Sequence, residues 1–245
     1  PTWSQSGSKI LPTGDAVYWN ALAWSLRGDK EAGEYAKNVF LKLADYPTWN
    51  HPWQIKRGRF ADHRSGGWAH RLATGYDLVY DLMTEPERVK VRKALMDNLV
   101  IGAYISHVMD DNITCATSNW LAMITGGSLM LQTAMWGDGP DVENLEPYFT
   151  ATAMKLFRFL ERVANYGEAW GEGYGYNRYS FENLSRSLPS LMNVFSIDFS
   201  NPVKNTYKEY GWCGIIKNKY TFYYGDSGNL GEATGWAWLL AKTKD

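Results

Sequence analysis

The 245-residue sequence has little cysteine and histidine: it contains two of the first and four of the second. Cys115 and Cys213 are too few for a disulfide scaffold, and they lack the C-x-x-C or Cys/His spacing of a zinc site. We interpret them as two buried thiols or as a single disulfide. The histidines form no H-x-x-x-H pair. The sequence therefore predicts no metal or other cofactor in this chain.

Long hydrophobic runs and a surplus of charge of one sign are also missing. The most apolar stretch, residues 121–136, is broken by two glycines, a serine and a glutamine, so it is not expected to span a membrane. Lysine and arginine number 25 against 26 aspartates and glutamates, which leaves a net charge of −1. No overall field draws the chain to nucleic acid or to an anionic membrane. Recognition of an anion must come from local groups.

Aromatic residues are abundant: the chain has 12 Trp, 16 Tyr and 9 Phe. Most such rings pack in ordinary cores, but rings with a polar tip are also favoured where one side is apolar and the other is wet. A cleft that stacks sugar rings is one such place. With 45% hydrophobic residues, the chain can bury one sizeable core.

Apolar periodicity predicts a succession of antiparallel helical hairpins. A Gly-Asp break at 28–29 separates two helices, and Thr84, Pro86 and Glu87 form the capping box that begins a later helix. Proline 189 is expected to interrupt a helix near the end. The expected helices cover residues 15–27, 30–46, 65–83, 89–109, about 115–136, 143–166, 180–195 and 230–243.

Hairpins of this kind are typical of helical repeats, either open solenoids or closed rings. The connection 46–66 is long and aromatic, and long loops are usually functional or disordered. We therefore expect an all-α fold, an incomplete (α/α) toroid that occupies residues 1–245 as a single domain.

Two segments carry polar groups suited to an acidic ligand. The stretch 56–64 gathers Lys56, Arg57, Arg59, His63 and Arg64. Arginine forks match carboxylates and sulfates, although a charged loop is often simply solvated. The second segment places Asn119 and Trp120 at the start of an apolar helix. Asn119 either belongs to the helix start or donates a hydrogen bond from its amide to a substrate carboxylate.

The third segment, GEAWGEGYGYNRYSFENL at 167–184, crowds aromatic and charged groups around glycines. If a helix begins at about residue 176, Tyr176 and Tyr179 share one face, as residues i and i+3 do. A stripe of core residues would explain the same spacing. Asn177 and Arg178 favour a partly exposed site instead.

Together these motifs resemble the helical domain of heparinase II/III-like polysaccharide lyases. The resemblance rests on the Gly-Asp hairpin break, on S-N-W opening an apolar helix, on E-G-x-x-Y-x-x-Y about fifty residues later and on Y-G-D-S-G near the end. The family implies an incomplete α/α toroid followed by a β-sandwich, and cleavage of uronic-acid polysaccharides by β-elimination. It also implies a secreted or periplasmic protein.

The resemblance implies roles for individual residues. Asn119 matches the amide that neutralises the uronate carboxylate, and Tyr176 best matches the tyrosine that serves as base and acid, with Tyr179 and Tyr174 as further candidates. A donor preorganised at that carboxylate stabilises the charge that develops when the C5 proton leaves. The expected substrate-binding residues are Arg57, Arg59, His63, Arg64, Trp53, Trp68, Trp120, Glu172 and Arg178.

The sequence departs from the family at two points. Trp120 stands where several lyases have a histidine, and nothing after residue 228 alternates like the strands of a β-sandwich. We therefore expect the sandwich, with any metal that it holds, to lie outside this chain. The isolated domain could then be inactive.

Two other functions remain open. A glycoside hydrolase on an α/α toroid would use two carboxylates, for which Glu168, Glu172 and Asp226 are available. A non-catalytic carbohydrate-binding module would rely on Trp49, Trp53 or Trp68. His70, His107 and Glu232 either line the cleft or pack against it.

Overall fold

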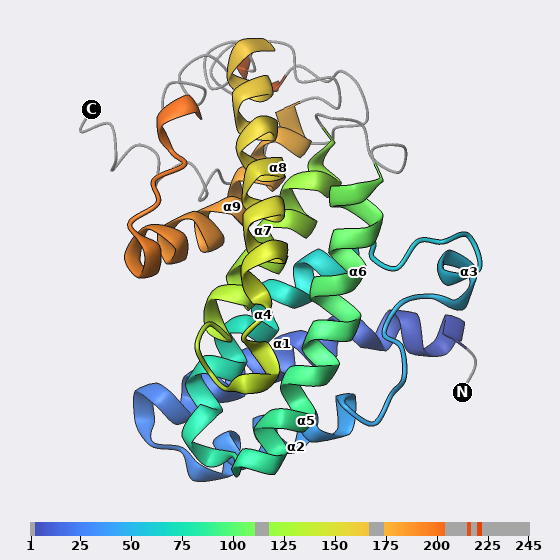
Figure 1. Cartoon of the computed structure of the whole chain (residues 1–245), viewed down its shortest axis with the longest axis vertical. Coiled ribbons are helices and arrows are strands. Elements are labelled where there is room, and N and C mark those ends of the chain that lie inside the picture. The colour runs from blue at the N-terminus through green and yellow to red at the C-terminus, as the bar shows by residue number, and fades with distance from the viewer. Residues whose placement is uncertain (1–2, 111–117, 167–173, 204–214, 217–219, 222–245) are drawn as a thin grey trace.

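The computed structural model describes residues 3–110, 118–166, 174–203, 215–216 and 220–221. This part of the chain is almost entirely helical (Figure 1). Its elements are α1 (Trp3–Arg27), α2 (Lys30–Leu43), α3 (Pro52–Ile55), α4 (His63–Val79), η1 (Tyr80–Leu82), α5 (Glu85–Leu95), η2 (Met96–Val100), α6 (Ile101–Ala103), η3 (Tyr104–Met109), α7 (Asn119–Ala134), η4 (Pro140–Val142), α8 (Leu145–Tyr166), α9 (Tyr174–Phe195), η5 (Asn201–Val203), β1 (Ile215–Ile216) and β2 (Tyr220–Thr221). The predicted all-α class is confirmed.

Local sequence signals place two helix starts correctly. Asp29 caps α2 by accepting a hydrogen bond from the backbone N–H of Ala32. The predicted capping box at the start of α5 is present, with Glu87 accepting from the backbone N–H of Thr84 at 2.7 Å. The helix expected over 89–109 continues from α5 through two π-helical stretches, η2 and η3.

Two helices begin well before the predicted residue. α1 begins at Trp3 rather than at residue 15. α9 starts at Tyr174 and passes through Pro189 without ending. The proline ring removes one N–H from the helical ladder, but Leu188 and Leu191 on either side are buried in the core, and that packing holds the helix together. The helix expected over 230–243 lies outside the described residues.

Four helices, α1, α4, α7 and α9, form a row in which all run in the same direction. Contacts between α1 and α4 join Asp15 to Arg71 and Val17 to Gly75. Along α4 and α7, Gly66 lies beside Met123, and further along Ala69 lies beside Gly127. Residue numbers rise together on both sides of each contact, which is the mark of parallel neighbours.

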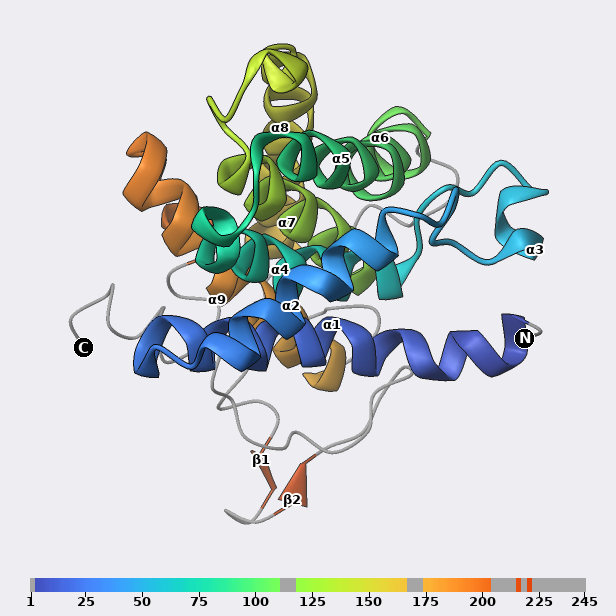
Figure 2. The ribbon, with the colours of Figure 1, turned by 90° about the horizontal axis from the view of Figure 1, so that it is seen from below.

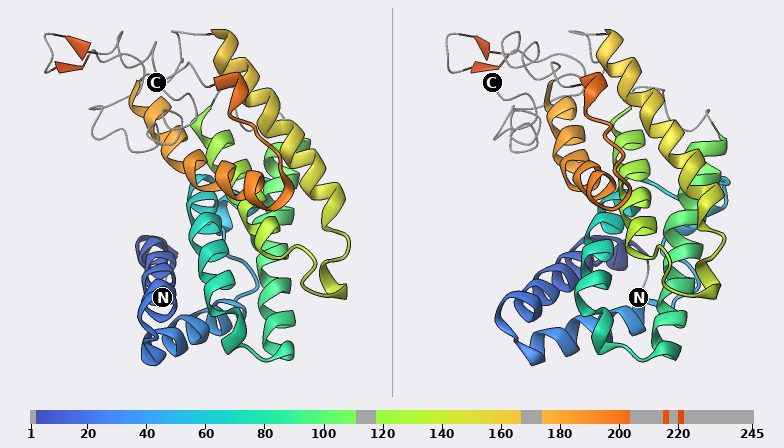
Figure 3. Two further views of the ribbon diagram at one scale, coloured as in Figure 1. Left: turned by 90° about the vertical axis from the view of Figure 1, so that its left-hand side faces the viewer. Right: turned by 60° about the vertical axis from the view of Figure 1, so that its left-hand side comes forward.

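The contact of α7 with α9 completes this inner row. Gly126 of α7 lies beside Leu184 and Ser187 of α9, and Figure 3 shows both helices starting at the same end of the molecule. The antiparallel return helices, α2, the α5–η3 helix and α8, pack outside the row. α1 and α8 consequently lie on opposite sides of the molecule in Figures 2 and 3.

Two apolar clusters hold the layers together. The first joins α1, α2, α4 and α5 around Phe40, Leu72 and Leu95, and the second joins α7, α8 and α9 around Leu129, Phe159 and Leu184. α7 contributes to both, since its C-terminal Leu131 belongs to the first cluster. The inner row is therefore continuous with the core.

The closest approach in the core is between α4 and α7. A Cβ atom added at Gly66 would lie 2.8 Å from the carbonyl group of Met123, and one at Gly127 would lie 2.4 Å from the carbonyl oxygen of Gly66. No real Cβ atom tolerates such contacts with backbone, so only glycine permits this spacing of the two helices. Gly67, the next residue in α4, faces away from that contact: its added Cβ would meet nothing closer than 3.6 Å.

We expect Gly66→Ala and Gly67→Ala to have opposite effects on stability. Gly66→Ala forces the helix backbones apart and should lower the free energy of unfolding by about 1–3 kcal/mol. Gly67→Ala fits the available space and gains the higher helix propensity of alanine, so it should raise stability by up to about 1 kcal/mol. Chemical denaturation followed by circular dichroism measures both. Equal effects of the two substitutions would contradict the close contact.

Candidate functional site

Three inner helices begin at the same end of the molecule and bring predicted site residues together. His63 is the first residue of α4, and the centre of its ring lies 4.9 Å from the ring centre of Trp120 at the start of α7. Gly126 of α7 lies beside Leu184 and Ser187 of α9. Because the two helices are parallel, Asn119, seven residues before Gly126, lies level with residues 177–180 of α9. The segments that the sequence predicted as three parts of one site therefore share one end of the inner row.

The start of α4 is held firmly in place. Asp62 caps the helix by accepting from the backbone N–H groups of Arg64 and Ser65, and Ser65 completes the capping box. The preceding loop is fastened to η3: the N–H of Phe60 donates to Ser106 Oγ at 2.7 Å, and Nε2 of His107 lies 3.0 Å from the carbonyl oxygen of Ala61. This part of the long connection 46–66 thus positions His63.

The start of α7 separates the two interpretations of Asn119. Ser118 is the N-cap, because its side chain accepts a hydrogen bond from the backbone N–H of Trp120 at 3.2 Å. Asn119 is the first helical residue, and its side chain is only 3% exposed. The capping role therefore belongs to Ser118, and Asn119 is buried at the end of the inner row for another reason.

The tyrosines of α9 lie along one face, as their spacing predicts. Tyr176 and Tyr179 are both half-buried, and Arg178 beside them forms an ion pair with Glu182 at 3.6 Å. Burial raises the pKa of the Tyr179 hydroxyl above its ordinary value, although the positive charges of Arg71 and Arg186 act in the opposite direction. Tyr179 is therefore protonated at neutral pH.

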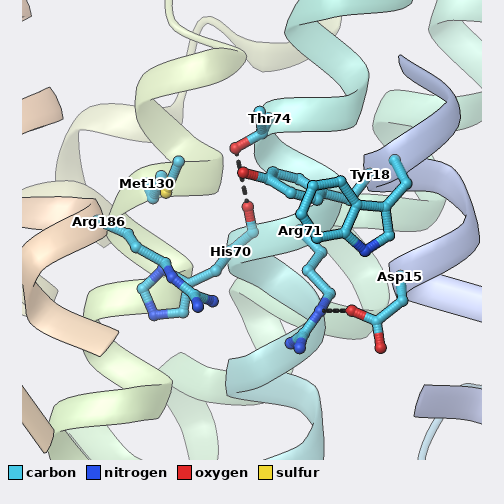
Figure 4. A pocket seen from close by; sticks show the side chains of 8 residues that line it. Asp15, Tyr18, His70, Arg71, Thr74, Met130 and Arg186 are labelled. Carbon is cyan, nitrogen blue, oxygen red and sulfur yellow. Dashed lines mark hydrogen bonds and ion pairs between the residues drawn. The ribbon is translucent and has the colours of Figure 1, made fainter. Parts of the chain in front are cut away.

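A pocket of about 310 Å³ opens along the inner row, between α1, α4, α7 and α9 (Figure 4). Residues of the first and last helices of the row, α1 and α9, both line it, so the row curves around the pocket. The lining residues are Asp15, Tyr18, Trp19, His70, Arg71, Thr74, Met130 and Arg186.

The pocket combines two arginines with an uncharged histidine. Nε of Arg71 donates to Asp15, and its Nη1 donates to the carbonyl oxygen of Gly67 at 3.1 Å. The Arg186 guanidinium makes no ion pair with any described residue. His70 is 2% exposed, and burial, followed by the charges of Arg186 and Arg71, lowers its pKa to about 3. His70 is thus neutral, and neither of its ring nitrogens has a hydrogen-bond partner among the described residues.

Several predicted substrate-binding residues lie away from this pocket. Trp53 and Arg57 belong to α3 and the turn after it, at the side of the molecule opposite α9 in Figures 1 and 2. The guanidinium carbon of Arg57 sits 3.6 Å from the centre of the Trp53 ring. These two residues stack on each other. The remaining cations of the segment, Arg59 and Arg64, are half-buried in the loop and at the start of α4.

The placement of Trp68 corrects its predicted role. We expected a ring that contacts substrate, but Trp68 is 3% exposed and packs edge-to-face against Trp49 in the core, with ring centres 5.8 Å apart. Both tryptophans belong to the first apolar cluster and serve packing. Glu168, Glu172, Asp226, Glu232, Cys115 and Cys213 lie outside the described residues, as does the side chain of Tyr174.

Sequence reasoning missed most of the pocket lining. Trp19 and Tyr18 come from α1, which was treated only as part of a hairpin, and the Trp19 side chain is 64% exposed. On α4, His70, Arg71 and Thr74 follow His63 at helical spacing on one face. That spacing was a usable signal, but it became informative only once the neighbouring helices were known.

Within the described part of the chain, no group of three His, Cys, Asp or Glu side chains is arranged to hold a metal ion. Among the helices that the structure describes, none has both the length and the apolar character needed to cross a membrane. Comparison with known proteins adds no family to this geometry: no protein-family model matches the chain, and no curated protein sequence is significantly similar to it.

Buried His107 should make stability depend on pH. Burial lowers its pKa from 6.5 to about 4, against the opposing hydrogen bond to Ala61. The unfolded chain therefore takes up a proton near pH 6.5, whereas the folded chain does so only near pH 4. Between these values the free energy of unfolding should fall by about 3 kcal/mol as pH is lowered, and this loss is absent above pH 6.5.

The test is denaturant unfolding of the protein and of His107→Gln at a series of pH values from neutral to pH 4. Glutamine keeps an N–H donor but does not titrate, so the loss of stability on acidification should be smaller in the variant. Ser106→Ala is the matched control, because it removes a neighbouring hydrogen bond and should lower stability equally at every pH. An unchanged pH dependence in His107→Gln would contradict the assignment.

Proposed function

We propose that this chain is the helical part of a polysaccharide lyase that cleaves a uronic-acid-containing acidic polysaccharide by β-elimination. The observation that carries the proposal is the convergence of Asn119, His63 and the tyrosines of α9 at one end of a parallel inner row, beside a pocket lined by Arg71 and Arg186. Amide and arginine donors suit the carboxylates of an acidic sugar chain, and a tyrosine hydroxyl suits proton transfer.

The curvature of the inner row supports an incomplete α/α toroid as the finer architecture. Parallel inner helices alternate with antiparallel outer helices, and α1 and α9 approach the same pocket from the two ends of the row. In a toroid the inner helices start at one end and surround a central cleft. The resemblance to heparinase II/III-like lyases supports the same arrangement, with a β-sandwich outside this chain and a secreted or periplasmic location.

In the proposed reaction, Tyr176 removes the C5 proton of the uronate, and the bond between C4 and the glycosidic oxygen breaks. The electron pair of the C5–H bond becomes the C4–C5 double bond, and the leaving oxygen receives a proton from the same tyrosine. Asn119 donates a hydrogen bond to the carboxylate as negative charge develops on it.

A specific observation also favours a second candidate, a carbohydrate-binding module without catalysis. Trp19 lines the pocket and is largely exposed. Its ring packs edge-to-face against that of Tyr18, with ring centres 5.0 Å apart. Such a ring stacks on the apolar face of a sugar whether or not a bond is broken. Turnover therefore separates the two candidates.

Tyr176→Phe should lower kcat by about 10²–10⁴-fold, because it removes the proton-transfer group, and Asn119→Ala by about 10²–10³-fold. The measurement is the ultraviolet absorbance of the unsaturated uronate product, with alginate, heparan sulfate, chondroitin, hyaluronan and ulvan as substrates. It should be made on this chain and on the longest native form that contains it.

Tyr35→Phe, at an exposed tyrosine of α2, is the matched control and should leave the rate unchanged. Release of reducing ends without ultraviolet absorbance would indicate hydrolysis instead. Absence of product from every substrate in both forms, with sugar binding retained, would favour the binding module.

A further inference from the structure

The pocket between α1, α4, α7 and α9 is separate from the end of the inner row where Asn119 lies. His70 and Arg71 follow His63 by seven and eight residues, about 11 Å along α4, and Met130 follows Asn119 by eleven residues, about 16 Å along α7. A sugar in the pocket is therefore not the one whose carboxylate meets Asn119. It belongs to a neighbouring position along the same chain.

The charges in the pocket suit one anion. Arg71 is neutralised in part by Asp15, which leaves Arg186 as the cation without an ion-pair partner among the described residues. Figure 4 shows the Arg186 guanidinium close to the His70 ring. Because His70 is neutral, the lining groups sum to one positive charge, with arginine forks that match the two oxygens of a carboxylate.

The uncharged groups in the pocket point to a sugar rather than to a simple ion. A neutral imidazole offers one donor and one acceptor, and both ring nitrogens of buried His70 lack partners among the described residues. A buried polar side chain left in this state is costly unless a ligand or water completes its hydrogen bonds. Hydroxyl groups of a sugar both donate and accept, and exposed Trp19 supplies an apolar surface for the sugar ring.

We propose that this pocket binds one uronic-acid residue, with its carboxylate on Arg186 and Arg71, a hydroxyl group on His70 and its apolar face against Trp19. The choice of sugar rests on the proposed action on an acidic polysaccharide, whereas the site itself rests on the pocket. Combined with Asn119, it selects polysaccharides that carry carboxylates at more than one position along the chain.

The test uses two probes that differ in one group: glucuronate carries a carboxylate where glucose carries a hydroxymethyl group. Binding to the full chain is followed by ligand-observed NMR and by tryptophan fluorescence. Glucuronate should bind more tightly than glucose, and Arg186→Gln should weaken glucuronate binding about ten- to a hundredfold, the value of a charge-assisted hydrogen bond. Trp19→Phe should remove the fluorescence response.

Arg158→Gln is the matched control, because Arg158 is an exposed arginine of α8 on the opposite side of the molecule. It should leave glucuronate binding unchanged, and circular dichroism checks the fold of each variant. Sodium sulfate is the third probe. Sulfate that binds as tightly as glucuronate, glucose that binds equally well, or glucuronate binding that survives Arg186→Gln would each overturn the proposal.

Failure of this proposal is distinguishable from failure of the lyase function. If the protein forms unsaturated product but its pocket does not bind glucuronate, the proposed uronate site is wrong and the lyase function is retained. If glucuronate binds in an Arg186-dependent way but no polysaccharide gives product, the uronate site is retained and the lyase function is contradicted.

Discussion

The approach of α4 to α7 through Gly66 and Gly127 is the contact on which the rest of the structure depends. It allows the two backbones to touch, with an added Cβ at either glycine falling within 3 Å of the partner helix. This spacing sets the ring of His63 against that of Trp120 at one end and brings His70 beside Gly126 further along. α1 and α9 then pack on the outer sides of this pair, and the pocket lies where the row of four helices curves.

The molecule contains buried polar groups of two kinds. Fully buried Arg92 is paired with Glu85, Asp138 and Asp141, and Tyr76 and Tyr80 donate to Asp138, so the turn after α7 is fastened to α5. Breaking such a network leaves uncompensated charge in the core. His70 is the opposite case, a buried ring without partners among the described residues.

The candidate site was predictable where local sequence rules apply. The Ser-Asn-Trp motif marked a helix start, and the spacing of Tyr176 and Tyr179 predicted a shared face, which the structure bears out. The tryptophans show where such reasoning stops. Trp68 and Trp19 are the same residue type in similarly amphipathic helices, yet one is in the core and the other is exposed at the pocket. Their difference depends on which neighbouring helix covers them.

The sequence by itself determined the all-α class, most of the described helices and the helix starts at Asp29 and Thr84, because periodicity and capping are properties of a few adjacent residues. It also determined the near-zero net charge, and with it the need for local groups to recognise an anion. Only the tertiary structure decided that Asp15, Arg71 and Arg186 meet in one pocket, since they lie on three helices far apart in the chain. Such proximity follows from the parallel packing of the inner row, and no local pattern encodes it.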